Sequence, residues 1–286
     1  MYVILGAAGK VGQTTATALR QASLPVRAVV RDAVQGAALA SIGCEVVFAD
    51  LHDQSALDRA LDGAQAVQVL VPLPRDDAHP ADTMRKTIDV TARVLALSDY
   101  GAELDADTGI TKLFHHLEAA LREVSPKLTL LRSAEHMQNW ARVLPVALSS
   151  GVLPSFHDPV DKRFPTISAG DVGVVSARLL RDGPSAAAMR VVSVEGPARV
   201  TANDVAQSIE KASGRPVKAL ALPRDQWASV LAQGGASEQH AQLIIDLFEA
   251  HNAGRIDVEA DAGERAFGTT SLDSAVAAMV ASANGR

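Results

Sequence analysis

Three glycines stand three residues apart near the start of the chain, at Gly6, Gly9 and Gly12, and this spacing could serve a phosphate group. They follow the apolar run YVIL at residues 2–5 and open a segment that predicts a helix from Gly12 to Ala22. One glycine would permit a tight turn, one would let backbone N–H groups approach a pyrophosphate, and one would let the helix pack closely on the strand. The pattern GxxGxxG at this place favours a dinucleotide over an ordinary glycine turn. The predicted phosphate-binding residues are Gly6, Ala8, Gly9, Lys10, Val11 and Gly12.

The end of the second predicted strand bears on which dinucleotide would fit. The sequence there is VVRD, with Arg31 before Asp32. An acidic side chain would accept hydrogen bonds from the ribose of NAD, whereas an arginine would pair with the 2′-phosphate of NADP. Arg31 lies nearest the strand end, so the sequence favours NADP(H) over NAD(H), while Asp32 argues for NAD. The ends of the third and fourth strands predict further contacts, near the adenine at Asp50 and Leu51 and near the middle of the cofactor at Val71 and Pro72.

The elements that must position these residues alternate regularly. Strands are expected at 2–5, 26–30, 44–50, 66–73, 94–98 and 127–133, and helices at 12–22, 33–42, 55–61, 81–93 and 111–124. Continuous Val, Ile and Leu strands separated by helices predict an α/β fold with a doubly wound, Rossmann-type parallel sheet. Later elements are expected at 172–181, with Asp171 as its cap, at the strand 189–196, and at the helices 224–233, 237–252 and 271–283. Thr201 and Asp204 predict a capping box for a helix that ends at Gly214.

The regular alternation of predicted strands and helices ends after residue 133, which suggests a second, smaller lobe. Four prolines between residues 145 and 165 interrupt short apolar pieces, and much of the last third has a helical pattern. We therefore expect a dinucleotide-binding domain at 1–133 plus about 165–195. A mostly helical, C-terminal substrate lobe is expected at about 134–164 and 196–270, with a closing helix at 271–286.

Composition excludes several function classes. The chain of 286 residues has a formal net charge of -6 and no lysine or arginine block, so nucleic acid is not an expected partner. Its apolar runs are too short to cross a bilayer, and no leader pattern precedes the first strand. The single cysteine, Cys44, excludes an internal disulfide, so the expected location is the cytoplasm. No metal is expected, because the pattern HHLE at residues 115–118 lacks ligand spacing. A monomer or a homodimer is expected.

Five segments resemble the NmrA-like group of atypical short-chain dehydrogenases. They are VILGAAGKVGQ (3–13), VRAVVRD (26–32), LLRSAEHMQNW (130–140), ISAGDVGVVSARLL (167–180) and EGPARVTANDVAQSIEKASGRPV (195–217). The group includes NADPH-dependent quinone reductases, triphenylmethane reductases and a redox-sensing regulator. The resemblance implies a Rossmann sheet with a C-terminal substrate lobe and places Ser133 and Ala134 beside the nicotinamide. By the same resemblance the substrate pocket would include Tyr100, His136, Met137 and Trp140.

One feature of short-chain dehydrogenases is missing from this sequence. These enzymes generally use a serine and a Tyr-x-x-x-Lys pair, in which the lysine lowers the pKa of a tyrosine that donates a proton. Tyr100 is followed four residues later by Leu104, and alignment on Ser98 puts Thr111 and His115 at the positions of the pair. Carbonyl reduction needs such a donor, whereas hydride delivery to a flat, electron-poor acceptor needs it much less. The candidate catalytic residues are therefore Ser98, His115 and His136, with each histidine alternatively a structural side chain.

Two function classes fit these residues. The leading hypothesis is an NADPH-dependent oxidoreductase that transfers hydride to a quinone-like or polycyclic aromatic small molecule, in secondary metabolism or detoxification. The alternative is a catalytically silent NADP-binding redox sensor of the NmrA type. A substrate pocket over the nicotinamide would favour the enzyme, and an exposed docking face would favour the sensor.

Overall fold

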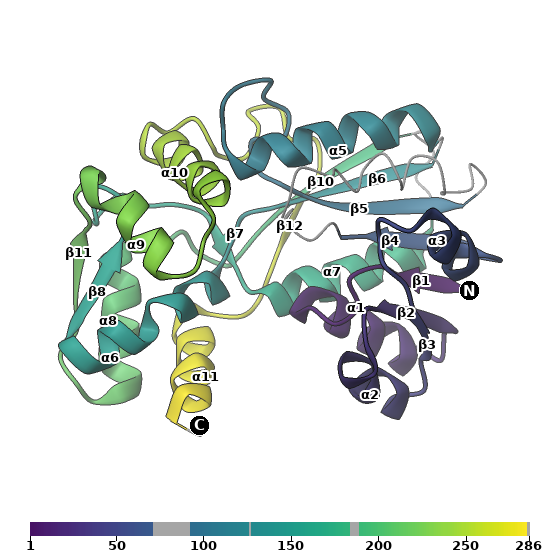
Figure 1. Cartoon of the computed structure of the whole chain (residues 1–286), viewed down its shortest axis with the longest axis horizontal. Helices are drawn as coiled ribbons and strands as arrows, with labels where there is room; N and C mark the ends of the chain where they lie inside the picture. The colour runs from purple at the N-terminus through teal and green to yellow at the C-terminus, as the bar shows by residue number, and fades with distance from the viewer. Residues whose placement is uncertain (71–91, 126, 184–188, 285–286) are drawn as a thin grey trace.

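One parallel sheet forms the centre of the molecule (Figure 1). The computed structural model describes residues 1–70, 92–125, 127–183 and 189–284. Within these residues the sheet consists of β1 (Tyr2–Ile4), β2 (Val26–Val30), β3 (Glu45–Phe48), β4 (Ala66–Val69), β5 (Arg93–Asp99), β6 (Leu128–Ser133), β10 (Met189–Glu195) and β12 (Arg265–Phe267). Their order in space is β12-β10-β6-β5-β4-β1-β2-β3, and all neighbours run parallel. The predicted Rossmann-type α/β fold is confirmed.

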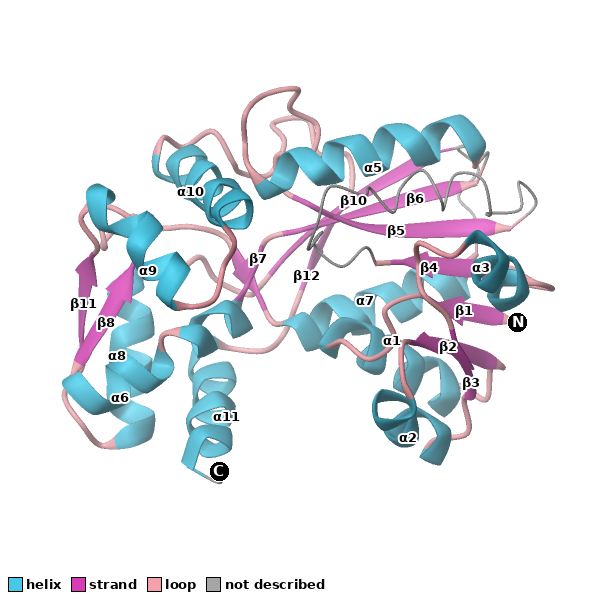
Figure 2. Ribbon diagram, viewed as in Figure 1, coloured by secondary structure: helices cyan, strands magenta, loops and turns pink. Residues whose placement is uncertain are grey.

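Helices cover both faces of the sheet because its strands are apolar on both sides (Figure 2). Tyr2 and Ile4 of β1 belong to the core with α1 (Lys10–Gln21), α2 (Ala33–Ser41) and α7 (Ala169–Asp182). Val3 and Leu5 alternate to the other face, where α3 (Gln54–Leu61) and α5 (Ile110–Val124) pack. This two-residue alternation within a continuous apolar run is what the sequence pattern predicts for a central strand.

A smaller lobe lies beyond the carboxyl ends of the strands (Figure 1). It contains two short parallel ladders, β7 (Glu135–His136) with β9 (Thr166–Ile167) and β8 (Val152–Ser155) with β11 (Lys218–Ala221). Its helices are η1 (Met137–Arg142), α6 (Leu144–Ser150), α8 (Ala202–Ser213), η2 (Arg224–Gln226), α9 (Trp227–Gln233), α10 (Glu238–Asn252) and α11 (Leu272–Asn284). Trp140, Phe164 and Val276 are part of a separate apolar core in this lobe. No helix of the described residues is both long and apolar enough to cross a membrane.

Several predicted element ends are confirmed, and others need correction. The capping box is present, since Thr201 Oγ1 accepts the Asp204 N–H at 3.0 Å and Asp204 Oδ2 accepts the Thr201 N–H at 2.8 Å. Asp171 is not the cap of α7, because Ser168 holds that position and Asp171 lies in the first turn. The Asp171 carboxylate instead accepts the N–H and hydroxyl of Thr270 at 2.8 and 2.9 Å, which ties α7 to the segment after β12.

Two other expectations concern strands. The helix expected at 81–93 lies almost wholly outside the described residues, and its last residue, Arg93, begins β5. The range 196–270, expected in the substrate lobe, includes β12, which pairs with β10 in the central sheet. A three-residue strand is too short for its pattern to be recognised in a sequence.

The glycine loop after β1 depends on close backbone packing. Gly6 has a φ of +71°, which favours glycine. A Cβ on Gly12 would lie 2.5 Å from the Gly6 carbonyl oxygen and 2.8 Å from Ala7 Cα, so the start of α1 can approach the loop only without a side chain there. A Cβ on Gly9 would meet the protein only at an ordinary 3.5 Å contact. Packing within the chain therefore explains why glycine stands at positions 6 and 12. It does not explain the glycine at position 9, where a side chain would fit.

We predict that Gly12→Ala destabilises the protein by about 1–3 kcal/mol, the usual cost of overpacking, because backbone atoms rather than flexible side chains block the new methyl group. The measurement is the free energy of unfolding in urea. Gly170→Ala is the matched control, since its Cβ would lie 3.5 Å from the nearest heavy atom and alanine favours the first turn of α7. Equal stability of the Gly12→Ala variant and the wild type would contradict the packing argument.

Candidate active site

The amino terminus of α1 is open to a ligand. Gly9 is the N-cap of this helix, with no side-chain cap and no acidic residue in the first turn. The first N–H groups of a helix lack partners within the helix and attract anions. Gly9 and Lys10 are exposed, and the missing side chain at Gly9 leaves room that the protein itself does not fill. These residues fit the pyrophosphate of a dinucleotide.

The end of β2 separates the roles of its two charged residues. The Asp32 carboxylate accepts the N–H of Gln35 at 2.9 Å and is the N-cap of α2. Arg31 is exposed, and its guanidinium forms no ion pair with any other residue that the structure describes. A capping role accounts for Asp32 without a ribose, which weakens the sequence argument for NAD.

The other four predicted cofactor contacts differ in exposure, and two of them lie outside the described residues. Asp50 is exposed, and its Oδ1 accepts the N–H of His52 at 2.9 Å in the turn after β3. Leu51 packs at the edge of the core beside α3. Val71 and Pro72 lie outside the described residues. Contact of these four residues with a cofactor stays a prediction.

The carboxyl ends of β5 and β6 meet in register at Asp99 and Ser133. The N–H of Tyr100 is shared between the Ser133 carbonyl at 3.1 Å and Asp99 Oδ1 at 3.0 Å. Ala134 donates its N–H to the carbonyl of Val194 on β10 at 2.9 Å. The predicted cofactor residues Ser133 and Ala134 are thus fixed at the same sheet edge as the loop that follows β1.

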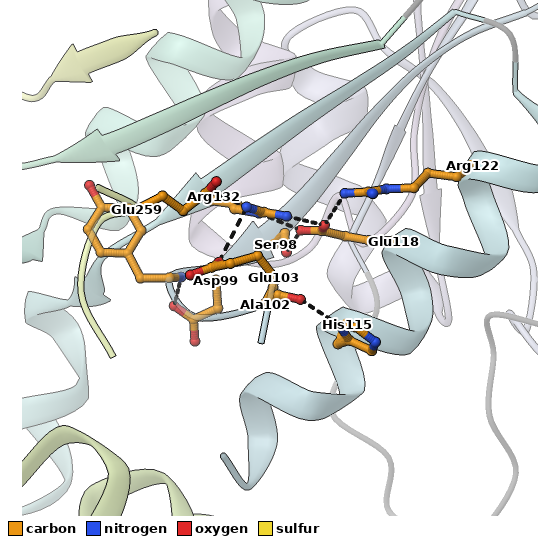
Figure 3. A network of polar contacts seen from close by, with 10 residues as sticks. Ser98, Asp99, Ala102, Glu103, His115, Glu118, Arg122, Arg132 and Glu259 are labelled. Carbon is orange, nitrogen blue, oxygen red and sulfur yellow. Dashed lines mark hydrogen bonds and ion pairs between the residues drawn. The ribbon is translucent and has the colours of Figure 1, made fainter. Parts of the chain in front are cut away.

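A buried ion-pair network lies beside this edge, on the α5 face of β5 and β6 (Figure 3). Arg132 binds Glu118 with two hydrogen bonds, Nε to Oε1 at 2.8 Å and Nη2 to Oε2 at 2.5 Å. Glu259 and Glu103 also pair with the Arg132 guanidinium. The Arg132 side chain is 2% exposed and that of Glu118 is 3% exposed, so each charge needs the other.

This network gives Ser98 a structural role, and we do not propose it as a catalytic residue. Its hydroxyl donates to Glu118 Oε1 at 2.6 Å, and Ser98 is buried against α5 (Figure 3). The proton of that hydroxyl is already committed to a carboxylate. Ser98 helps to satisfy a buried charge, which the sequence alone could not reveal because Glu118 is 20 residues away.

His115 also has a structural partner. Its Nδ1 lies 3.0 Å from the carbonyl oxygen of Ala102 (Figure 3). A carbonyl can only accept, so Nδ1 carries the proton and the ring fastens the segment after β5 to α5. This is the structural alternative for His115, and we do not propose it as a catalytic residue.

The side chains expected to face a substrate differ in exposure. Tyr100, Met137 and Trp140 are 2%, 1% and 7% exposed. Trp140 packs with Phe164 in the lobe core, while burial and the nearby Glu195 carboxylate raise the pKa of Tyr100. His136 is half-buried, with Nε2 3.5 Å from Ser133 Oγ. Burial lowers the pKa of His136 against the opposing effect of Glu135, so its imidazole is neutral near pH 7.

Two acidic residues of this edge escaped sequence reasoning. Glu135 follows β6 and pairs with His157, Oε2 to Nε2 at 2.9 Å. Despite its burial, the contact with His157 lowers the pKa of Glu135. Asp99 ends β5, and burial together with Glu135 raises its pKa to about 7, against the hydrogen bond from Tyr100. The available signal is an acidic residue just past a predicted parallel strand, one residue beyond it for Asp99 and two for Glu135.

Comparison with known proteins supports the resemblance noted in the sequence. The NmrA-like family model matches residues 2–90, which include the glycine loop and the end of β2. Over this range the chain is similar to the NmrA-like family, and the range contains the first four strands of the sheet.

Individual relatives match the chain far beyond that range. The NAD(P)H azoreductase of Xenophilus azovorans is 25% identical over 256 residues, 87% of this chain and 86% of the relative. Quinone oxidoreductase 2 of Escherichia coli is 25% identical over 252 residues, 86% of each chain. Its structure in complex with NADPH has a TM-score of 0.78, at 22% identity, over 98% of this chain and all of the other. The triphenylmethane reductase of Citrobacter sp., complexed with NADP(H), has a TM-score of 0.79 at 17% identity, over 98% of this chain and 100% of the other.

The structural likeness covers the lobe as well as the sheet. Because the matched share of this chain reaches 98%, the fold of the whole chain, and not the glycine loop alone, is that of the two reductases.

We predict that Glu118→Gln lowers the free energy of unfolding by about 3 kcal/mol, because it leaves the Arg132 guanidinium buried without its bidentate partner. The remaining pairs of Arg132 with Glu103 and Glu259 keep the loss at the low end of the range for broken buried pairs. Urea unfolding measures it. Asp182→Asn, which breaks the exposed pair with Arg181, is the control and should change stability by less than about 1 kcal/mol. Similar losses in both variants would contradict a special role for the buried pair.

Proposed function

We propose that this chain is an NADPH-dependent oxidoreductase that transfers hydride to a quinone-like or polycyclic aromatic small molecule. One observation carries the proposal. The chain that presents an open helix amino terminus at the carboxyl edge of its sheet is also similar to a quinone oxidoreductase over 86% of its length. The named activities of the azo and dye reductases point to the same acceptor class, which is planar and electron-poor.

The cofactor would be held by the residues of the glycine loop. The N–H of Gly9 donates to the Gly6 carbonyl at 3.1 Å and holds the turn, so the backbone N–H groups from Lys10 to Gly12 would bind the pyrophosphate. Arg31 would pair with the 2′-phosphate. In this proposal Ser133 and Ala134 hold the nicotinamide end, near which the reduced ring supplies a hydride when bound. The NADP preference rests on Arg31 being exposed while Asp32 is committed to capping α2.

The substrate would bind between that edge and the smaller lobe. His136 keeps a partly exposed ring there, so we propose it as a substrate contact. Tyr100, Met137 and Trp140 are buried, and we propose that they shape the wall rather than touch the acceptor. Because a planar acceptor takes hydride without a tyrosine and lysine pair, its absence from the sequence does not oppose the proposal. A monomer or homodimer that binds no nucleic acid stays our prediction.

Turnover is the direct test. We expect the purified chain to oxidise NADPH in the presence of benzoquinone, naphthoquinone, phenanthrenequinone or an azo dye. The loss of the absorbance of the reduced nicotinamide measures the reaction. Background reduction is measured without protein. Binding of NADPH, detected by its fluorescence, with no turnover on any acceptor would contradict the enzyme and support a redox sensor.

We predict that Arg31→Ala raises the Kd for NADPH about tenfold or more, since a charge-assisted hydrogen bond to a phosphate contributes about 1.5–3 kcal/mol. The Kd for NADH should remain unchanged, because NADH has no 2′-phosphate. Fluorescence titration of both nucleotides measures the effect. Arg181→Ala, an exposed arginine at the end of α7, is the control for a general loss of positive charge. An equal loss of affinity for both nucleotides would refute the assignment of Arg31.

A further inference from the structure

We propose that Asp99 is the acid that donates a proton to the reduced acceptor, an inference that rests on the proposed function. Neither the sequence pattern nor the relatives' names assign a proton donor. Ser98 and His115 are engaged elsewhere, and a neutral His136 carries no imidazolium proton to give. Asp99 is the remaining acidic group at the carboxyl end of β5.

The position of Asp99 in the sheet supports this role. In a doubly wound sheet a dinucleotide lies across the carboxyl ends of the strands, centred where the strand order reverses. Here that point is between β1 and β4, with β2 and β3 on one side and β5 and β6 on the other. Arg31 at the end of β2 would hold the adenine half, so the nicotinamide half falls on the side of β5 and β6. Asp99 ends β5 and is in register with Ser133.

The alternation of β5 separates Asp99 from the buried arginine. Ser98 and its register partner Arg132 both face Glu118 on α5. Successive strand residues point to opposite faces, so Asp99 is directed away from this network, as Figure 3 also shows. Arg132 is committed to Glu118, Glu103 and Glu259. Asp99 therefore has no ion-pair partner among the described residues.

The local contacts leave one carboxyl oxygen available. Oδ1 accepts the N–H of Tyr100 at 3.0 Å, and no other hydrogen bond to the Asp99 carboxyl occurs within the described residues. The side chain is half-buried, so it keeps a surface for a ligand. The charged group that acts on it is Glu135 of β7, which is itself held by His157. Burial and this negative neighbour raise the pKa of Asp99 to about 7, the value that suits an acid near neutral pH.

The proposed step balances for a quinone. A bound NADPH would supply a hydride, which would bring two electrons to the quinone and leave a negative charge on one of its two oxygens. The O–H bond of the Asp99 carboxylic acid breaks, its proton forms a new O–H bond on that oxygen, and water then returns a proton to the carboxylate. The net reaction consumes one NADPH, one quinone and one proton and yields NADP⁺ and a hydroquinone.

The first test compares Asp99→Asn with the wild type in steady-state kinetics across pH. We expect kcat of the wild type with naphthoquinone to fall above about pH 7, where the acid is ionised. The Asn variant should have a kcat about ten- to a hundredfold lower at pH 6 and no descending limb, with an unchanged Kd for NADPH. Asp58→Asn, an exposed aspartate on α3, is the control. Wild-type turnover and pH profile in Asp99→Asn would overturn the proposal.

The second test needs neither cofactor nor acceptor. The pKa of Asp99 in the folded chain is raised to about 7 from its ordinary 3.8. Between these values the folded state holds a proton that the unfolded state lacks, so this group's contribution to stability decreases as pH rises through the interval. Asn accepts the Tyr100 N–H without a charge. The melting temperature of Asp99→Asn should therefore exceed that of the wild type by an amount that grows from pH 5 to about pH 7, reaches several degrees and then levels off. A constant difference would overturn the raised pKa and with it the proposal.

Another variant, Glu135→Gln, keeps the proposal testable if Asp99→Asn does not fold. Glu135→Gln removes the negative neighbour but keeps the acid, so the descending limb of kcat should move to lower pH. A limb that does not move would contradict the coupling. If no acceptor is reduced by the wild type, the proposed function fails, whereas the melting experiment still reports on Asp99. If quinones are reduced and Asp99→Asn behaves as the wild type, only the role of Asp99 fails.

Discussion

All strands of the central sheet run in one direction, and this constraint brings distant segments to a single edge. The carboxyl end of β1 leads into the glycine loop, that of β2 into Arg31, and those of β5 and β6 into Asp99 and Ser133. Parallel neighbours must be joined by crossovers, so helices cover both faces. The crossovers pack closely enough that a Cβ on Gly173 of α7 would lie 2.6 Å from Thr14 of α1.

The alternation of side chains along β5 and β6 then places the polar residues of this edge on opposite faces of the sheet. Residues that face α5 build a satisfied network around Arg132, which includes Ser98 and Glu118. The next residues along the two strands, Asp99 and Ser133, point to the opposite face and do not contact the Arg132 guanidinium. The difference in partners between Glu118 and Asp99 follows from this alternation. Glu118 pairs with Arg132, whereas Asp99 has no ion-pair partner among the described residues.

What the sequence could predict was local in origin. The glycine loop, the capping box of α8 and most strands follow from patterns within a dozen residues, because turns, caps and apolar runs depend on near neighbours. The roles of three other residues depend on partners farther along the chain. Asp171 binds Thr270, 99 residues away, and Ser98 binds Glu118, 20 residues away. His115 binds Ala102, 13 residues away. Such partners are set by packing after folding. For the same reason, the pairing of Glu135 with His157 had no pattern by which to be found.

Glu135 stands where the chain leaves the sheet for the lobe, and this position links the two parts. It lies two residues after the end of β6 and belongs to the ladder of β7 with β9, where Thr166 Oγ1 donates to its carbonyl at 2.8 Å. Its side chain reaches His157 in the segment after β8. The histidine lowers the pKa of Glu135, and the charge of Glu135 adds to burial in raising the pKa of Asp99 to about 7. The pKa values of two carboxyl groups at one edge are thereby shifted in opposite directions, and in our proposal the contact of Glu135 with the lobe tunes the acid Asp99.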